Sequence, residues 1–242
     1  MSRQDLGIKG LRIKGMCEGE KSGKGETGGK ENAELGTRIA KLHQGRTLMK
    51  TIYDTIYEMA KPYLNTRYND VHIDLSYDFT KRLLQYYPQA DEAIALPAIL
   101  LHDVGWKMVP EEEQPGAFGP EVKNHEAQRF HEIEGVRIAG EILNELKYPE
   151  DKIHEILDII DGHDTRMEAL SLNDKLVKDA DKLWRFTPIG VDIDHARFGI
   201  ERIPYMIYLE DRIKDWFFTP AAEEMASEAL AIARSEFTGE NL

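Results

Sequence analysis

Hydrophobic residues recur at helical spacing over most of the chain from about residue 37 onward. Their positions predict helices at about residues 37–62, 71–84, 94–101, 122–146, 153–160 and 172–183, and over most of the chain after 203. Proline or glycine follows several of these segments, as is typical of helix ends. No strand-like alternation of any length is visible, so the sequence predicts an all-α fold.

Two segments do not follow the helical pattern. Residues 1–36 carry nine of the 19 glycines, together with many Lys and Glu. Such a stretch cannot bury enough apolar surface to offset its ordering entropy, so we expect a flexible tail before a single helical domain at 37–242. Residues 107–121 are rich in proline and glycine, and we expect a solvated loop that serves as a lid or an insertion.

Charge and composition narrow the class of partner. The formal net charge is −13, which argues against duplex nucleic acid, because duplex binding needs a cationic surface. A small phosphorylated substrate stays compatible, since a bound metal ion inverts the local field. The sequence favours no particular oligomeric state.

Cysteine usage and hydropathy point to the cytoplasm. Cys17 is the only cysteine, which rules out an internal disulfide and a multi-thiolate zinc site. The longest apolar run, at 94–101, is too short to span a bilayer, and the first residues lack the apolar core of a signal peptide. We therefore expect a cytoplasmic protein without a membrane partner.

A set of His and Asp residues lies on predicted helices or at their ends, spread over about 110 positions. Imidazoles and carboxylates gathered from several helices are what a divalent metal site in a helical bundle requires. The set therefore suggests a metalloenzyme, and it consists of His72, the doublet His102-Asp103, His131, His163 and Asp181.

Each of these residues also has an ordinary structural explanation. The doublet His102-Asp103 ends an apolar helix, where burial is costly unless a metal or hydrogen bonds compensate, and a hydrogen-bonded pair without metal would suffice. His72 faces the core side of its helix, as many structural histidines do. A salt bridge would satisfy Asp181, and Asp164 could take the place of His163.

Taken together, the residues resemble a known pattern. The string Leu-Leu-His-Asp-Val-Gly-Trp at 100–106 is similar to the central motif of the HD-domain superfamily of metal-dependent phosphohydrolases. The string Asp-Ala-Asp-Lys-Leu at 179–183 is similar to the superfamily's C-terminal motif. The resemblance covers roughly residues 45–215 and implies an HD-type helical bundle.

The resemblance also implies a ligand set. Its minimal form holds one metal ion through His72, His102, Asp103 and Asp181. Members of the superfamily with two further histidines in between hold two metal ions, and His131 and His163 match those positions. We therefore expect two divalent ions with Asp103 as their bridge. Mixed nitrogen and oxygen ligands suit iron or manganese, and less specifically nickel, cobalt or zinc.

The activity expected from the resemblance is hydrolysis of a phosphoester or phosphoanhydride bond by metal-activated water. The substrate would be a nucleotide or another small phosphorylated molecule. Asp103 and Lys182 are the expected catalytic residues, and the phosphates would bind Lys107, Arg166 and Arg185, although each cation taken alone reads as ordinary surface charge. Four aromatic residues would either stack on a substrate ring or belong to the core: Trp106, Phe118, Trp184 and Phe186.

Two other classes of function remain open. Inositol oxygenase and a phosphonate-cleaving oxygenase use the same scaffold and the same six ligands, so a mixed-valent di-iron oxygenase is the alternative. An oxygenase would need iron and consume O₂, whereas a hydrolase would tolerate Mn²⁺. A binding protein that keeps the site as a relic or a sensor is disfavoured by the intact ligand set.

Overall fold

The computed structural model describes residues 51–239, and over this range it contains helices and no strands. The all-α prediction is thereby confirmed. The predicted tail at 1–36, and the start of the first predicted helix, lie outside the described residues. The helices are α2 (Ile52–Leu64), α3 (Asn69–Tyr86), α4 (Glu92–Leu101), the 3-10 helix η2 (Val104–Met108), α5 (His125–Glu145), α6 (Glu150–Ile160), α7 (Leu172–Leu183), the 3-10 helix η3 (Trp184–Phe186), α8 (Pro188–Phe198), α9 (Arg202–Trp216) and α10 (Pro220–Thr238).

Side chains that cap the first turn explain where most of these helices begin. Thr51 and Asp54 form a capping box at the start of α2, in which each side chain bonds the other's backbone N–H. Ser171 caps α7 by accepting from the backbone N–H of Asp174, and Thr219 caps α10 in the same way. These short local signals fix the helix starts that the hydrophobic pattern leaves approximate.

Helix α4 lies at the centre of the bundle. Every residue from Ile94 to Leu101 is buried, which is why this segment reads as a continuous apolar run rather than as an amphipathic helix. The helix packs against α2, α3, α6 and α7. Its C-terminal end therefore lies inside the protein, and the residues that follow Leu101 are held there.

A close contact between η2 and α5 positions the next part of the core. A Cβ atom on Gly105 would lie 1.9 Å from the carbonyl oxygen of His131 and 2.5 Å from the backbone nitrogen of Gly135. Only glycine at position 105 permits this approach. The contact brings the segment after α4 directly against the middle of α5.

The structure corrects three sequence predictions. Pro62 lies inside α2, which continues to Leu64, and the helix predicted from 122 begins at His125. The segment at 107–121 is not simply solvated, because Gln114 and Ala117 are buried and the Gln114 side chain donates to the carbonyls of Trp106 and Val109. Proline and glycine prevented a helix here, but they did not determine exposure.

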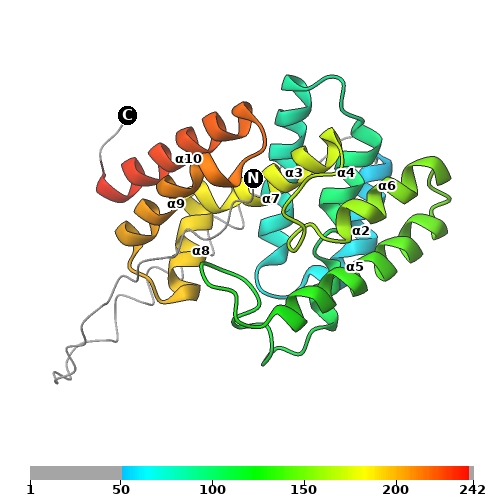
Figure 1. Ribbon diagram of the computed structural model, residues 1–242, viewed down its shortest axis with the longest axis horizontal. Coiled ribbons are helices and arrows are strands. Elements are labelled where there is room, and N and C mark those ends of the chain that lie inside the picture. Colours follow the sequence, from blue (N-terminus) through cyan, green and yellow to red (C-terminus); the bar gives the residue numbers. More distant parts are fainter. Residues whose placement is uncertain (1–50, 240–242) are drawn as a thin grey trace, which may run out of the picture.

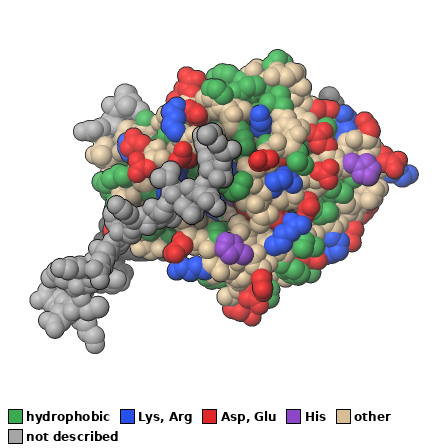
Figure 2. Space-filling model, viewed as in Figure 1, with side chains coloured by type: hydrophobic (Ala, Val, Ile, Leu, Met, Phe, Trp, Pro, Cys, Tyr) green, Lys and Arg blue, Asp and Glu red, His purple; other side chains and the backbone are tan. Residues whose placement is uncertain are grey.

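The helices form two groups. Figure 1 shows α8, α9 and α10 on one side of the molecule and α2 to α6 on the other, with α7 between them. Helix α10 contacts α7, α8 and α9, so the C-terminal group is packed onto the central helices. Acidic and basic side chains are interspersed over the face in Figure 2. Between 51 and 239, no helix has the length and apolar character needed to cross a membrane.

Candidate metal centre

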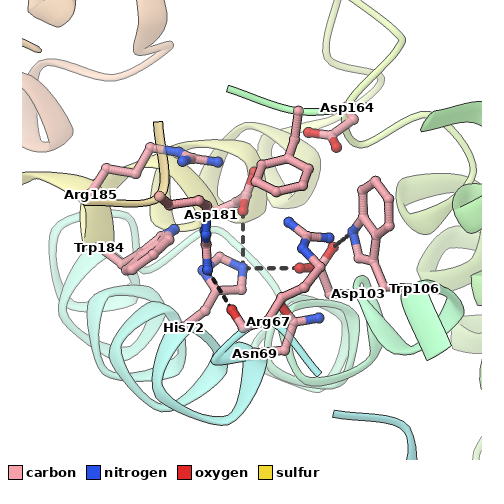
Figure 3. A pocket seen from close by; sticks show the side chains of 11 residues that line it. Arg67, Asn69, His72, Asp103, Trp106, Asp164, Asp181, Trp184 and Arg185 are labelled. Atoms are coloured by element: carbon pink, nitrogen blue, oxygen red, sulfur yellow. Dashed lines mark hydrogen bonds and ion pairs between the residues drawn. The ribbon is translucent and has the colours of Figure 1, made fainter. Parts of the chain in front are cut away.

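The six ligands expected from the sequence lie together in one cluster. His72 comes from α3, His102 and Asp103 follow the end of α4, His131 lies on α5, His163 follows α6, and Asp181 lies on α7. All four histidines are at most 4% exposed. Figure 3 shows His72, Asp103 and Asp181 facing one another across a pocket, with Asp164 on its other side. Five separate segments therefore supply one site.

One set of three ligands consists of His72, His102 and Asp181. The Nε2 atoms of His72 and His102 are 3.0 Å apart. The Asp181 Oδ1 atom lies 3.3 Å from each of them. Two imidazole nitrogens and one carboxylate oxygen thus converge, as the ligands of a divalent ion do.

The second set consists of His131, His163 and Asp164. The two histidine Nε2 atoms are 3.2 Å apart, and Asp164 Oδ2 lies 3.6 Å from that of His131 and 3.9 Å from that of His163. The sequence offered Asp164 only as a substitute for His163. In the structure both residues face the cluster, so the candidate ligands number seven rather than six.

Asp103 lies between the two sets. Its Oδ2 atom is 3.5 Å from Nε2 of His72, and its Oδ1 atom is 3.5 Å from Nε2 of His163. The Nε1–H of Trp106 donates to Oδ1 over 3.0 Å and fixes the rotation of the carboxylate. The Oδ1 atom also lies 3.7 Å from Nε2 of His102, so the Asp103 carboxylate contacts both sets, as a bridging ligand must.

Backbone carbonyls orient two of the histidines. The Nδ1 atom of His102 is 2.8 Å from the carbonyl oxygen of Ile99, and that of His163 is 2.9 Å from the carbonyl oxygen of Ile160. A carbonyl only accepts, so Nδ1 carries a proton in both rings, which leaves Nε2 as the atom available to bind a metal ion. This is the tautomer that binds metal through Nε2.

The electrostatics of the cluster favour bound positive charge. Burial lowers the pKa of His163, but the carboxylates of Asp164 and Asp103 outweigh it and raise that pKa to about 10. The reverse holds for Asp103, where burial raises the pKa but the neighbouring histidines bring it well below its usual value. Burial lowers the pKa of His131 to about 4. Buried anions surrounded by nitrogen ligands therefore fit a divalent cation in both charge and donor type.

Two buried charged residues hold the segment that carries His163 and Asp164. The Nζ atom of Lys178, on α7, donates to the carbonyls of Gly162, His163 and Arg166 at 2.8, 2.8 and 3.0 Å. Glu132, on α5, accepts from the backbone N–H groups of Asp164 and Thr165 and from the Thr165 hydroxyl. These bonds leave little freedom to the turn after α6.

Three arginines line the pocket beside the candidate ligands. The side chains of Arg185 and Arg197 both donate to Asp194, which is fully buried. The guanidinium of Arg67 lies between the rings of Trp106 and Phe118, 4.0 and 3.7 Å from their centroids. Its Nε and Nη1 atoms are buried and have no hydrogen-bond partner within the described range. Three positive charges against one carboxylate leave the arginine group with a net charge of +2.

Of the four cations expected from the sequence to act on the substrate, two line the pocket or the adjoining cavity and two do not. Arg185 lines the pocket, and Lys182 lines an adjoining cavity. Lys107 and Arg166 are not among the residues lining either one. Lys107 donates to the Asn65 side chain, whereas Arg166 donates to the carbonyls of Asp158 and Asp161 at the end of α6.

Sequence reasoning missed Arg67 and Arg197, and no local motif marks either residue. Of the four aromatic residues, Phe186 is fully buried in the core, whereas the other three line the pocket, namely Trp106, Phe118 and Trp184. Trp106 also stacks on the His131 ring, with centroids 3.9 Å apart.

A comparison with protein families agrees with this geometry. The model of the HD domain matches residues 69–185, which run from the start of α3 through η3. This segment is an HD domain. HD-domain proteins bind divalent metals and are in general metal-dependent hydrolases. The segment contains all seven candidate ligands, whereas α8, α9 and α10 lie beyond it. No curated protein and no solved structure matches the chain.

Proposed function

We propose that this protein is a metal-dependent phosphohydrolase that cleaves a phosphoester or phosphoanhydride bond of a nucleotide or other small phosphorylated molecule. The observation that carries the proposal is the group of three arginines beside the metal ligands. Phosphate oxygens are the anions that planar guanidinium groups bind best. An HD-type metal site with such a group next to it is suited to a phosphoryl substrate.

Two divalent ions fit the ligand arrangement. His72, His102 and Asp181 would hold one ion, and His131, His163 and Asp164 the other, with Asp103 shared between them. Iron or manganese suits these nitrogen and oxygen donors, and nickel, cobalt or zinc would also bind. When bound, such ions lower the pKa of water and withdraw charge from the phosphoryl oxygens.

The chain's own residues would position the substrate. Arg67 offers two buried N–H groups that have no protein acceptor within the described residues, so phosphoryl oxygens would be their natural partners. Arg185 and Arg197, held by Asp194, would contact the same group from its other side. Trp106 would keep Asp103 in its bridging orientation.

Lys182 would act at the leaving group. It follows Asp181 on α7 and lines the cavity that adjoins the metal centre. In hydrolysis, the water oxygen forms a bond to phosphorus while the bond from phosphorus to the leaving oxygen breaks. The leaving oxygen must then take up a proton, and the Lys182 ammonium would stabilise or protonate it.

The first test is metal content and phosphate release on protein purified without chelator. We expect about two equivalents of metal per chain, and release of inorganic phosphate from a panel of phosphoesters and phosphoanhydrides that chelation abolishes and Mn²⁺ restores. His131→Ala should lose one equivalent. The matched control is His125→Ala, an exposed histidine at the start of the same helix, which should keep both.

Three other results would contradict the proposal in different ways. Iron-dependent O₂ consumption without phosphate release would favour the oxygenase alternative. Close to one equivalent of metal would reduce the site to a mononuclear centre. Wild-type metal content in His102→Ala would remove the assignment of the ligands altogether.

A further inference from the structure

A second cavity, of about 190 Å³, adjoins the candidate metal centre. It shares Phe118, Asp164, Asp181 and Arg185 with the pocket that contains the metal ligands. A group attached to a phosphoryl bound at the ligands would therefore extend into this cavity. The residues that line it define what that group can be.

The wall of the cavity is a continuous series of aromatic rings. Starting beside the metal ligands, the series runs through Phe118, Phe198, Tyr205, Tyr208 and Trp216, which all line the cavity. The centroids of consecutive rings are 5.9, 6.1, 6.1 and 5.9 Å apart. Such spacing is typical of rings in mutual contact.

This aromatic wall does not belong to the HD domain itself. Only Phe118 lies within residues 69–185. The other four rings come from the end of α8 and from α9, in the C-terminal group of helices. The chain has therefore added these rings to the metal site from outside the matched segment.

Phe198, Tyr208 and Trp216 pack against the main hydrophobic core but are not fully buried by it. Tyr205 is buried, whereas Phe118, Phe198, Tyr208 and Trp216 are each only partly buried around the cavity. Large aromatic side chains without a cavity between them would normally bury one another. Their remaining exposure leaves ring surface available to a ligand.

One hydrogen bond connects the aromatic wall to the arginines. The hydroxyl of Tyr205 donates to Asp194, the carboxylate that also holds Arg185 and Arg197. The residues that would contact phosphate and the residues that would contact its substituent thus share one buried anchor. The polar side chains of Gln128 and Lys182 line the same cavity.

We propose that this cavity binds a planar aromatic or heteroaromatic ring carried by the leaving group of the substrate. The substrate would then be a phosphomonoester of an alcohol that carries a ring. If that alcohol is a nucleoside, the edge of its base would also form hydrogen bonds with the Gln128 side chain. This inference rests on the proposed phosphohydrolase function. Tyr208 and Trp216, farthest from the metal ligands along the aromatic wall, are its specificity residues.

The test compares matched substrates on the metal-loaded protein. Adenosine 5′-monophosphate and ribose 5-phosphate differ in the presence of the base. Benzyl phosphate and ethyl phosphate differ in a bare ring while their alcohols have similar acidity. Since stacking on aromatic side chains contributes about 10- to 100-fold per base, we expect kcat/KM to favour the ring-bearing member of at least one pair by that factor. A preference in the first pair alone would indicate a nucleobase, whereas a preference in the second pair would show that a simple aryl group is sufficient.

Two variants locate the effect. Trp216→Leu and Tyr208→Leu should each reduce the kcat/KM preference for the ring-bearing substrate at least fivefold, and the change should lie in KM. The binding affinity of the preferred ligand, measured by calorimetry, should fall by a similar factor. A variant that merely destabilises the fold lowers both members of a pair and leaves their ratio unchanged. Tyr86→Leu, an exposed tyrosine at the end of α3, is the matched control and should keep the wild-type ratio.

The outcomes separate the inference from the proposed function. Equal kcat/KM within both pairs would overturn the aromatic site while the phosphohydrolase stands. A preference that survives both variants would also overturn it, because the ring would then bind elsewhere. Absence of turnover on all four substrates and on the wider phosphoester and phosphoanhydride panel would overturn the phosphohydrolase itself, and this inference with it.

Discussion

Replacing Arg67 with methionine should make the protein more stable and less active. The Arg67 guanidinium is largely buried, it has no carboxylate partner within the described residues, and two of its nitrogen atoms have no hydrogen-bond partner there. Burial lowers the pKa of Arg67 to about 10, and the carboxylate of Asp103 only partly opposes this. The folded protein thus carries a positive charge that its surroundings disfavour.

The magnitude follows from that shift. A depression of the pKa by roughly 2.5 units corresponds to about 3 kcal/mol of unfavourable free energy while the group is charged. Methionine would lose the contacts with Trp106 and Phe118, for which cation–π interactions are worth about 1 to 2 kcal/mol together. The net expected gain in the free energy of unfolding is about 1 to 2 kcal/mol.

The same pKa shift predicts how the stability should depend on pH. Above about pH 10 the folded state releases the proton of Arg67 before the unfolded state does, so the stability attributable to this group rises with pH there. Well below pH 10 both states are protonated and the full cost is present. The gain in Arg67→Met should therefore be constant at neutral pH and decline only above about pH 10.

The activity should change in the opposite direction. A charge-assisted hydrogen bond to phosphate is worth about 1.5 to 3 kcal/mol, which corresponds to a loss of roughly 10- to 100-fold in kcat/KM. The assays are urea unfolding for stability and phosphate release for activity, both at fixed metal content. The control is Arg82→Met, because Arg82 also lies over an aromatic ring, that of Phe79, but is exposed on α3 and should change neither quantity appreciably.

One combination of results would refute the reasoning. If Arg67→Met lowers stability by 1 kcal/mol or more while kcat/KM stays unchanged, Arg67 supports the fold and does not bind the substrate. A gain in stability without loss of activity would keep the electrostatic argument but remove Arg67 from the phosphate site. The stability and activity measurements thus test separate steps of the argument.

Two further substitutions test how the site is supported. Lys178→Met removes three charged hydrogen bonds from the carbonyls around the turn that carries His163. We expect the free energy of unfolding to fall by about 3 to 5 kcal/mol in denaturation experiments, and metal retention to weaken in elemental analysis. Lys175→Met, on the exposed face of the same helix, should change neither quantity. Gly105→Ala places a Cβ atom 1.9 Å from the backbone of α5 and should destabilise the protein by about 3 kcal/mol or more. Gly140→Ala, where the nearest atom is a side-chain methyl at 3.7 Å, should be neutral or stabilising in the same unfolding measurements, and similar losses in both glycine variants would show that the close approach at Gly105 is not what decides.

Six of the seven candidate ligands were predictable because together they resemble a known family pattern, although each alone has an ordinary structural explanation. His102 and Asp103 end an apolar helix, and His163 follows another helix, so their polarity stands out against buried flanks. Helix α4 was likewise predictable, since a helix buried on all sides needs an unbroken apolar sequence. At these positions the local sequence pattern and the tertiary packing indicate the same buried location.

The cations proposed to bind the substrate were less predictable, because a residue that follows a ligand in the sequence need not point its side chain toward the pocket. Lys107 and Arg166 follow ligands closely along the chain, yet their side chains turn to Asn65 and to the end of α6. Arg67 reaches the pocket from a turn in which it and Tyr68 adopt positive φ, and it is held by rings from distant segments. Only the folded chain brings these groups together.

The pocket therefore contains two opposed sets of charges. Asp103, Asp164 and Asp181 attract cations, while the arginines, only partly neutralised by Asp194, attract anions to the same pocket. Without bound metal, the three carboxylates would repel a phosphate from the site that the arginines prepare. Cations at the ligands convert that repulsion into attraction, so metal and phosphate should each bind more tightly in the presence of the other, by the same factor. If the protein acts as proposed, arginines and carboxylates in one pocket make recognition of the substrate depend on the metal that acts on it.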